Sequence, residues 1–387
     1  MNNKKHFISD EAFNGTAAEK LEEPANTIFL ANDLAEHMKM PPKDILTALG
    51  QEYLDIAAAA LDIAGTYSRL GEYPKALAWY RKALDTYEKV LGQEHQDIAA
   101  TYNNIAFIYA RQGDYSHALT WYQKALAINE KLLGPEHPDT AAAYNNIAGI
   151  YDNQGDYPKA LAWYRKVLAI SEKVLGTEHP DTATTYNNIA SIYSRQGDYA
   201  GALVWYNKDL AISEKVLGTE HPDTATTYNN IAFVCSRQGE YAKALDWYHK
   251  ALAIREHILG LAHPATAATY NNIAEVYFSQ RDYPEALDWL QKALIIREKG
   301  PGKNHPDTAT MYNNIAEIYD SQGDYHQALA WYQKSYGILQ SILKDTHPST
   351  KTVKDNMEAA YQNAGLSKPF EQWLQSIQTT PAKHLPR

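Results

Sequence analysis

Residues 171–190 read SEKVLGTEHPDTATTYNNIA, and residues 213–232 repeat the same string. The step from 171 to 213 is 42 residues, and the chain keeps it on both sides. All eight tryptophans follow this step: Trp79, Trp121, Trp163, Trp205, Trp247, Trp289, Trp331 and Trp373. A period of this length is typical of arrays in which each repeat is one supersecondary unit. The sequence therefore predicts a repeat protein, in which no unit buries its apolar face alone and neighbours stack into a continuous core.

Each repeat reads as two amphipathic helices. In one repeat, residues 97–112 place Tyr102, Ile105, Ala106 and Tyr109 on one stripe, as a helix buried on one face requires. The turn at 113–115 ends that helix, and a second stripe runs from residue 118 to 133. At 138–140, Pro-Asp-Thr predicts the next helix start, with side-chain oxygens as its caps.

The repeat resembles the tetratricopeptide signature. Tyr102-x-x-Ile105-Ala106-x-x-Tyr109 followed by Ala118-x-x-x-Tyr122 is similar to the family's W-x2-L-G-x2-Y…A-x3-F pattern. The period exceeds the family's common length of about 34 residues, because the second helix carries extra turns. This long form, with its LG-x-EHPDTA linker and YNNIA helix, is similar to the repeats of kinesin light chains and related bacterial proteins over about residues 50–378.

The resemblance implies an all-α fold, a right-handed superhelical solenoid of stacked antiparallel helix pairs. We expect a degenerate helical cap in residues 1–50, where Leu49-Gly50 matches Leu91-Gly92 one period later. About seven repeats fill residues 51–348, a partial repeat and C-terminal cap fill residues 349–378, and residues 379–387 form a tail. Residues 1–50 contain no sustained apolar heptads, the coiled-coil pattern through which kinesin light chains join a motor. The resemblance therefore leaves open both a motor-linked role and a bacterial-type scaffold.

The asparagine pair of the YNNIA helix is the main functional candidate. In the resembled family the first helix of each pair lines the concave side, so the first asparagines form a row along one groove. These are Asn103, Asn145, Asn187, Asn229, Asn271 and Asn313. A primary amide offers a donor and an acceptor, which suits the backbone of an extended peptide. The alternative, favoured for the second asparagine, is that the amides tie neighbouring repeats together.

Residues flanking this row predict the specificity of the groove. The first five repeats offer arginines and two phenylalanines, and repeats six and seven offer glutamates. The candidate residues are Arg69, Arg111, Arg195, Arg237, Phe107, Phe233, Glu275 and Glu317. Arginine binds carboxylates bidentately, so an acidic ligand segment suits the first part and a basic segment suits the second. The alternative is that these are ordinary solvated charges.

No motif predicts catalysis, a cofactor or a metal. Seven histidines from His95 to His347 also follow the 42-residue step, which puts each in a different repeat, too far apart to share one ion. We expect them to pack or to form hydrogen bonds at the inter-repeat turns. Cys235 occupies a core position that holds tyrosine in other repeats, which predicts a buried, inert thiol.

Composition narrows the class of partner. The net charge is −10, from 36 basic and 46 acidic residues without a basic block, so neither nucleic acid nor an anionic membrane is the expected partner. One cysteine fits a reducing compartment. No apolar run approaches the roughly 18 residues of a membrane span, and the start shows no signal peptide. We expect a cytoplasmic protein.

The sequence therefore predicts a non-enzymatic adaptor or scaffold that binds an extended peptide or partner segment in its concave groove. Two alternatives remain open. One is a structural scaffold that self-assembles through end-to-end stacking or clasped grooves. The other is a substrate-recruiting subunit of an enzyme whose catalytic domain lies on another chain.

Overall fold

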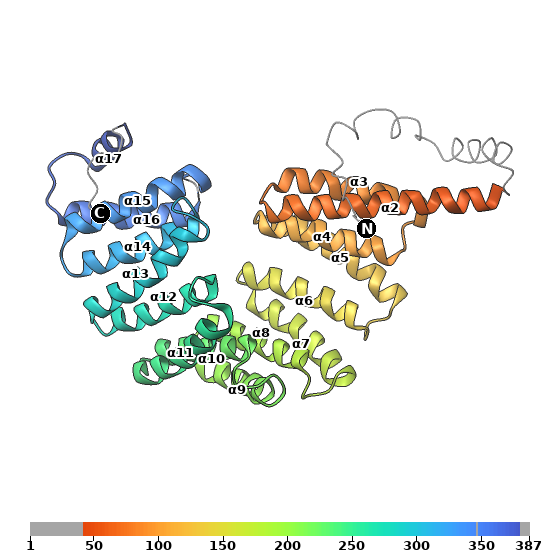
Figure 1. Ribbon diagram of the computed structural model, residues 1–387, viewed down its shortest axis with the longest axis horizontal. Helices are drawn as coiled ribbons and strands as arrows, with labels where there is room; N and C mark the ends of the chain where they lie inside the picture. The colour runs from red at the N-terminus through yellow and green to blue at the C-terminus, as the bar shows by residue number, and fades with distance from the viewer. Residues whose placement is uncertain (1–41, 346, 380–387) are drawn as a thin grey trace, which may run out of the picture. The chain divides into compact units, whose positions relative to one another are not determined.

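The computed structural model describes residues 42–345 and 347–379, and all regular structure in these residues is helical (Figure 1). Residues 1–41 of the expected N-terminal cap and residues 380–387 of the expected tail lie outside the described residues. The chain divides into two compact units, residues 1–170 and 171–387, with the division falling within helix α7. Each unit is described by itself.

The helices alternate along the chain between first and second members of a pair. The first unit contains α2 (Pro42–Arg69), α3 (Tyr73–Leu91), α4 (Gln96–Arg111), α5 (Tyr115–Leu132), α6 (Pro138–Asn153) and most of α7 (Tyr157–Val174). The second unit contains α8 (Pro180–Arg195), α9 (Tyr199–Val216), α10 (Pro222–Arg237), α11 (Tyr241–Ile254), the π-helical η2 (Arg255–Leu259), α12 (Pro264–Ser279), α13 (Tyr283–Lys299), α14 (Pro306–Ser321), α15 (Tyr325–Leu343), α16 (Pro348–Asn363) and α17 (Phe370–Thr379).

Within each unit, consecutive helices pack as antiparallel pairs and each pair packs on the next (Figure 1). In the first unit, α4 packs against α5, and α5 against α6; in the second, α8 packs against α9, and α9 against α10. The predicted all-α class of stacked helix pairs is confirmed.

Small residues allow the paired helices to approach closely. Ala106 on α4 and Ala118 on α5 are both fully buried, and Tyr122 packs with them in one cluster. In the second unit, Ala232 and Ala244 repeat this arrangement with Tyr248. Cys235 lies in the same cluster, where burial raises the pKa of its thiol, so the predicted buried cysteine is confirmed.

The lattice histidines cap the first helices. The Nδ1 of His137 accepts a hydrogen bond of 3.2 Å from the backbone N–H of Asp139, and His221 does the same for Asp223 at 3.1 Å. The other five, His95, His179, His263, His305 and His347, cap in the same way. The N-cap of these helices is therefore a histidine ring nitrogen. The Asp and Thr side-chain oxygens that we expected to cap them do not do so. The threonine reaches backwards instead, as Thr140 donates to the carbonyl of Gly134 at 2.8 Å.

One helix crosses residue 50, the expected border between the N-terminal cap and the first repeat. Helix α2 runs unbroken through Gly50 to Arg69, so residues 42–50 and the first helix of repeat one form a single helix. Tyr53 stands where later repeats carry the capping histidine, and Leu54 stands where most of them carry proline. Without a cap or a helix-breaking residue, nothing in the sequence stops the helix at Gly50.

The short turn between paired helices needs a left-handed residue. Gly239 fills this place between α10 and α11 with φ of 79°, as glycine does at no steric cost. Between α12 and α13 the same place holds Arg281, with φ of 63°. A side chain with a Cβ is strained in this conformation, so Arg281 is a local departure from the repeat.

The tryptophans that define the period lie at the edge of the core. Trp121 is half-buried, its ring centroid 5.2 Å from that of Tyr102, and Lys124 Nζ lies 4.5 Å from the Trp121 centroid. Trp163, Trp205, Trp247 and Trp331 repeat the arrangement. They pack against the core clusters, and a lysine Nζ covers one side of each ring.

Candidate functional site

All the predicted site residues lie on first helices, at matching places in the repeat. Arg69 ends α2, α4 carries Asn103, Phe107 and Arg111, and α6 carries Asn145. In the second unit, α8 carries Asn187 and Arg195, α10 carries Asn229, Phe233 and Arg237, α12 carries Asn271 and Glu275, and α14 carries Asn313 and Glu317. Every first asparagine is half-buried, so each can contact both its neighbours and solvent.

The asparagines of the second unit bind one another across the repeats. The Nδ2 of Asn314 donates to the Oδ1 of Asn271 at 2.8 Å. Asn272 donates to Asn229 at 3.1 Å, and Asn230 donates to Asn187 at 3.2 Å. Each bond joins the second asparagine of one repeat to the first asparagine of the preceding repeat. At these places the second asparagine therefore ties repeats together.

These ties change what the first asparagines can offer a ligand. At Asn187, Asn229 and Asn271 the oxygen already accepts a hydrogen bond from the next repeat. At most one lone pair of the oxygen, together with the Nδ2 donor, is then left for a ligand. The Nδ2 groups of Asn229 and Asn271 donate to no other group in the described part of the chain. Asn187 differs, because its Nδ2 donates to Asp209 Oδ2 at 2.7 Å. In the first unit, the Oδ1 of Asn103 is buried and has no hydrogen-bond partner among the described residues.

Two buried charges that we did not predict lie beside this row. Asp209 on α9 is 4% exposed and accepts from Asn187, from Thr227 at 2.7 Å and from Ser213 at 2.9 Å. Burial raises the pKa of its carboxyl, and these three donors oppose the rise. Its sequence signal was an aspartate at a place that holds alanine at residues 83, 125, 251 and 293.

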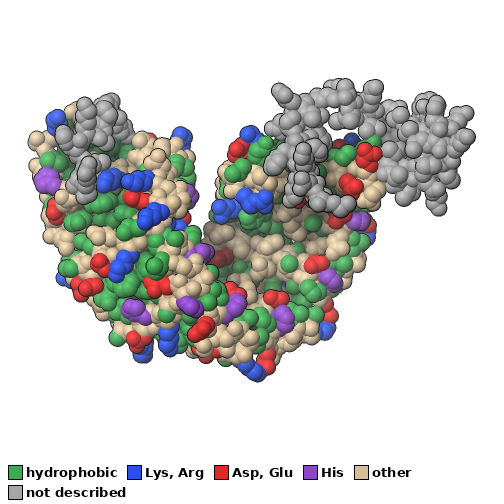
Figure 2. Space-filling model, viewed as in Figure 1, with side chains coloured by type: hydrophobic (Ala, Val, Ile, Leu, Met, Phe, Trp, Pro, Cys, Tyr) green, Lys and Arg blue, Asp and Glu red, His purple; other side chains and the backbone are tan. Residues whose placement is uncertain are grey.

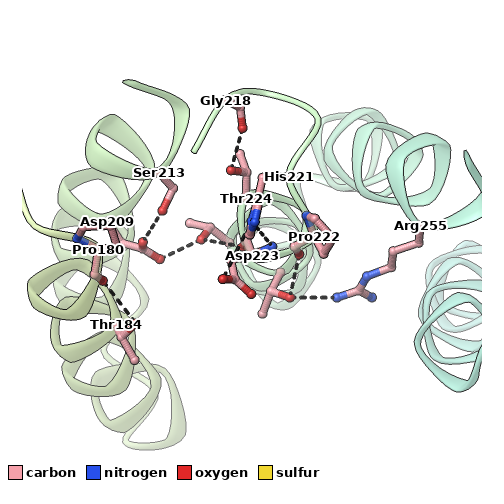
Figure 3. Close-up of polar contacts among 12 residues, drawn as sticks. Pro180, Thr184, Asp209, Ser213, Gly218, His221, Pro222, Asp223, Thr224 and Arg255 are labelled. Carbon is pink, nitrogen blue, oxygen red and sulfur yellow. Dashed lines mark hydrogen bonds and ion pairs between the residues drawn. The ribbon is translucent and has the colours of Figure 1, made fainter. Parts of the chain in front are cut away.

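Arg255 is the second buried charge, at 7% exposure in η2. It donates to Thr269 Oγ1 at 2.7 Å, to Thr226 Oγ1 at 3.3 Å and to Asn229 Oδ1 at 3.4 Å. Figure 3 shows Asp209 and Arg255 reaching toward α10 from opposite sides. Arg255 forms no ion pair within the described residues, and burial lowers the pKa of its guanidinium. It occupies the place of Ser171 and Ser213, which was its only sequence signal.

The predicted arginines are exposed, and two are tethered by tyrosines of the preceding repeat. Arg111 Nε lies 3.5 Å from the Tyr73 hydroxyl, and Arg237 Nε lies 3.4 Å from the Tyr199 hydroxyl. Arg69 instead donates to Thr66 on its own helix, and Arg195 is also exposed. A tether at Nε leaves the terminal nitrogens of the guanidinium to face solvent or a ligand.

The two predicted phenylalanines are large apolar side chains left in solvent. Phe107 is 49% exposed and Phe233 is 39% exposed. On the face shown in Figure 2, basic and acidic side chains are interspersed, without one large field of either sign on the described helices.

The glutamates belong to a cavity of about 440 Å³ in the second unit. Its lining residues are Arg237, Asn271, Ala274, Glu275, Phe278, Ser279, Leu290, Asn314, Glu317 and Ile318. It thus gathers side chains from α10, α12, α13 and α14. Asn271, Arg237, Glu275 and Glu317 were predicted, whereas Phe278 was not. In the sequence, Phe278 could have been noticed as an aromatic residue seven places after Asn271, because the preceding repeat has Ser236 at this place.

Neither a membrane span nor a metal centre emerges from the described residues. None of the helices in residues 42–345 and 347–379 is long and apolar enough to cross a bilayer. Over the same residues, no group of three or more His, Cys, Asp or Glu side chains is placed to hold a metal ion.

The fold and this face define a helical repeat scaffold. The tetratricopeptide repeat family model matches residues 55–131, 97–173, 139–214, 181–257 and 265–341. These matches cover well over half of the sequence, so the chain belongs to the tetratricopeptide repeat family. The gap at residues 258–264 includes the end of η2 and the loop that follows it.

Solved structures support the same fold. Aspartyl phosphate phosphatase F from Bacillus subtilis is 16% identical with a TM-score of 0.60, over 84% of this chain and 87% of that one. BtubC (BKLC) from P. vanneervenii is 23% identical with a TM-score of 0.50, over 60% and 94%. The Rap conjugation gene regulator of plasmid pLS20, in complex with the Phr* peptide, is 16% identical with a TM-score of 0.53, over 74% of each chain. No curated protein matches.

Proposed function

We propose that this chain is a non-enzymatic interaction scaffold that binds an extended peptide or partner segment along the face of its first helices. The observation that carries the proposal is the pair of unused amide donors on Asn229 and Asn271, in adjacent repeats of one unit. An extended peptide presents backbone carbonyls at regular intervals, and amide N–H groups are suitable donors to them.

The neighbouring side chains support the same role. Phe233 and Arg237 lie one and two turns after Asn229, and both are exposed. Exposed aromatic and arginine side chains are the residue types enriched at binding hot spots. The pLS20 regulator has a related fold and was solved with a peptide bound, which agrees with peptide recognition by this fold.

The test removes the donors and keeps the ties between repeats. In an Asn229→Asp, Asn271→Asp double variant, each residue keeps an oxygen that accepts from Asn272 or Asn314 and loses its N–H groups. The new carboxylate at residue 229 also faces Arg255, which already donates to this place, so the tie there should be strengthened and not lost. A control variant, Gln238→Glu with Gln280→Glu, adds the same two charges at exposed places beyond the ends of α10 and α12.

The probe is a library of randomised nine-residue peptides, selected on the wild-type protein, with affinities then measured by fluorescence polarisation. Each lost hydrogen bond is worth about 0.5–1.5 kcal/mol, so we expect the double variant to bind the selected peptides roughly tenfold more weakly or worse. The control should bind within about twofold of wild type. If no peptide is enriched over its scrambled sequence, or if the double variant binds as well as wild type, the proposal is wrong.

A further inference from the structure

The cavity between α10, α12, α13 and α14 has a lining that discriminates among ligand side chains. Glu275 and Glu317 enter it from adjacent first helices, and Arg237 enters it from the helix before them. The cavity therefore contains two carboxylates and one guanidinium. Arg237 is anchored at Nε by Tyr199, 3.4 Å away, so it is held at the α10 side.

The Glu317 carboxylate lacks a cation. It accepts from the Nδ2 of Asn313 at 2.8 Å and from the Nδ2 of Asn356 at 3.2 Å, and it forms no ion pair within the described residues. Burial raises the pKa of this carboxyl, the Asn313 bond opposes the rise, and the nearby Asp320 and Glu275 carboxylates add to it. Neutral amides thus hold a partly desolvated anion that a cationic ligand group would stabilise.

Two further acceptors on α14 are unsatisfied. The Asn313 Oδ1 and the Asp320 Oδ1 are both buried and accept no hydrogen bond among the described residues. Buried polar atoms without partners are rare in folded proteins. Each of these two oxygens could accept a hydrogen bond, and no donor among the described residues provides one. These two residues do not line the cavity, but they lie on the same helix as Glu317, so this end of the unit carries an excess of acceptors and negative charge.

The remaining wall is apolar and aromatic. Phe278 is half-buried, its ring centroid 5.9 Å from that of Tyr283, and Leu290 and Ile318 also line the cavity. An aromatic face and aliphatic side chains can contact the stem of a long basic side chain while carboxylates bind its head. An acidic ligand side chain could pair only with Arg237 and would be repelled by two carboxylates. A purely apolar side chain would leave the carboxylates desolvated without compensation.

We propose that this cavity receives an arginine side chain of the bound peptide, with its guanidinium between Glu275 and Glu317 and its plane on Phe278. The planar fork of arginine binds carboxylates bidentately and stacks on aromatic rings, which a lysine ammonium does not do. This inference rests on the proposed function, because it assigns the chemistry of one residue of the peptide.

The direct probe is N-acetyl-arginine-N′-methylamide, compared with its neutral isostere N-acetyl-citrulline-N′-methylamide. Binding is followed through the methyl NMR signals of Leu290 and Ile318, with Ile147 of the first unit as a remote reference. We expect the arginine probe to shift the Leu290 and Ile318 signals and the citrulline probe to bind about tenfold more weakly or not at all. Equal shifts with both probes would overturn the inference.

The variant that tests the carboxylates is Glu275→Gln with Glu317→Gln. Glutamine keeps the oxygen that Asn313 and Asn356 contact, so the melting temperature should not fall. The arginine probe should lose about tenfold or more in affinity. A control, Glu285→Gln with Asp288→Asn, removes two exposed carboxylates from α13 and should leave binding within about twofold. If the cavity variant binds arginine as wild type does, the inference is wrong.

The selected peptides separate this inference from the proposed function. Peptides enriched for arginine at one position, and weakened by Glu275→Gln with Glu317→Gln, support both. Peptides that need Asn229 and Asn271 but show no preference for a basic residue leave the proposed function standing and overturn the arginine assignment. If no peptide is enriched, the proposed function fails, and the arginine assignment fails with it, even if the small probe binds.

Discussion

Single residues that depart from the repeat show where its constraints act. Arg281 is the clearest case, because it fills a left-handed turn position with φ of 63° that Gly239 and Gly323 fill in neighbouring repeats. We expect Arg281→Gly to raise the free energy of unfolding by about 1 kcal/mol. The left-handed conformation costs a residue with a Cβ about 1–2 kcal/mol, and glycine removes this strain. Glycine also gives the unfolded chain more conformational entropy, which offsets part of the gain. Urea denaturation followed by circular dichroism measures it.

The mirror substitution provides the control. Gly239→Ala places a Cβ in the same backbone conformation, with φ of 79° and no atom within 4 Å of the added carbon. It should lower stability by about 1 kcal/mol through backbone strain alone. If both substitutions changed the free energy of unfolding in the same direction and by the same amount, backbone strain would not explain the effect of either.

Asp209 makes a second prediction at the residue scale. Its carboxyl is buried among neutral donors, and its pKa is raised above the ordinary value of 3.8, chiefly by burial. The folded chain therefore holds this proton to higher pH than the unfolded chain does. The contribution of Asp209 to stability must fall as pH rises through the interval above 3.8 and recover as pH falls through it.

The Asp209→Asn variant isolates this contribution. The free energy of unfolding of wild type, relative to the variant, should rise as pH is lowered from about 7 to about 4. Asp246→Asn, at an exposed place on α11, controls for the loss of one negative charge. If the free energy of unfolding of wild type differs from that of the variant by the same amount at every pH in this range, Asp209 does not titrate as described.

At the scale of elements, the sequence period was enough to predict the helix pairs. Positions such as Ile105, Ala106 and Ala118 recur in every repeat, and the burial of a helix stripe depends only on that local pattern. The start of α2 was not predicted, because a missing cap at Tyr53 removes a boundary without adding any pattern of its own.

The candidate site was predicted less completely, because its hydrogen bonds connect residues 43 positions apart. The row of asparagines could be listed from the sequence, but the partner of each amide depends on how repeats stack. Asn271 could have faced a ligand with both polar atoms, and its oxygen binds Asn314 instead. Arg255 and Asp209 were missed for a related reason: a single polar residue in a helix gives no sign of burial until its neighbours are placed.

The asparagine tie predicts coupling between adjacent elements. In a double-mutant cycle, Asn271→Ala and Asn314→Ala should each destabilise the protein, because either one leaves a half-buried amide without its partner. The double variant should lose about 0.5–1 kcal/mol less stability than the two single variants lose together, since the two residues share one hydrogen bond of 2.8 Å.

Asn229 and Asn314 form the matched control pair. Both belong to ties, but Asn229 pairs with Asn272 and Asn314 pairs with Asn271. Their substitutions to alanine should add within about 0.5 kcal/mol. Coupling of the same size in both pairs would mean that the asparagines act through a general loosening of the stack, and not through the individual bonds.

At the largest scale, a repeat array is stabilised by each helix pair and by the interfaces with its neighbours. Within the second unit, α10 packs against its pair partner α11, against α8 and α9 of the preceding repeat, and against α12 of the next. The last described helix, α17, packs Phe370 and Trp373 on Tyr361, with ring centroids 5.5 Å and 4.7 Å from that of Tyr361. Stability should therefore be graded along the unit, with amide hydrogen exchange slowest in α10 and fastest toward α17.

Two core substitutions of similar size test this gradient by hydrogen-exchange mass spectrometry. Met357 is fully buried on α16 and Ile231 is 3% exposed on α10, and truncating either to alanine should cost about 2–5 kcal/mol. Because interfaces act between neighbours, Met357→Ala should speed exchange in α16 and α17 while leaving α10 protected. Ile231→Ala should speed exchange in the helices on both sides of α10. If Met357→Ala exposes α10 as much as α16, the unit unfolds as a single cooperative block, and the nearest-neighbour account of its stability is wrong.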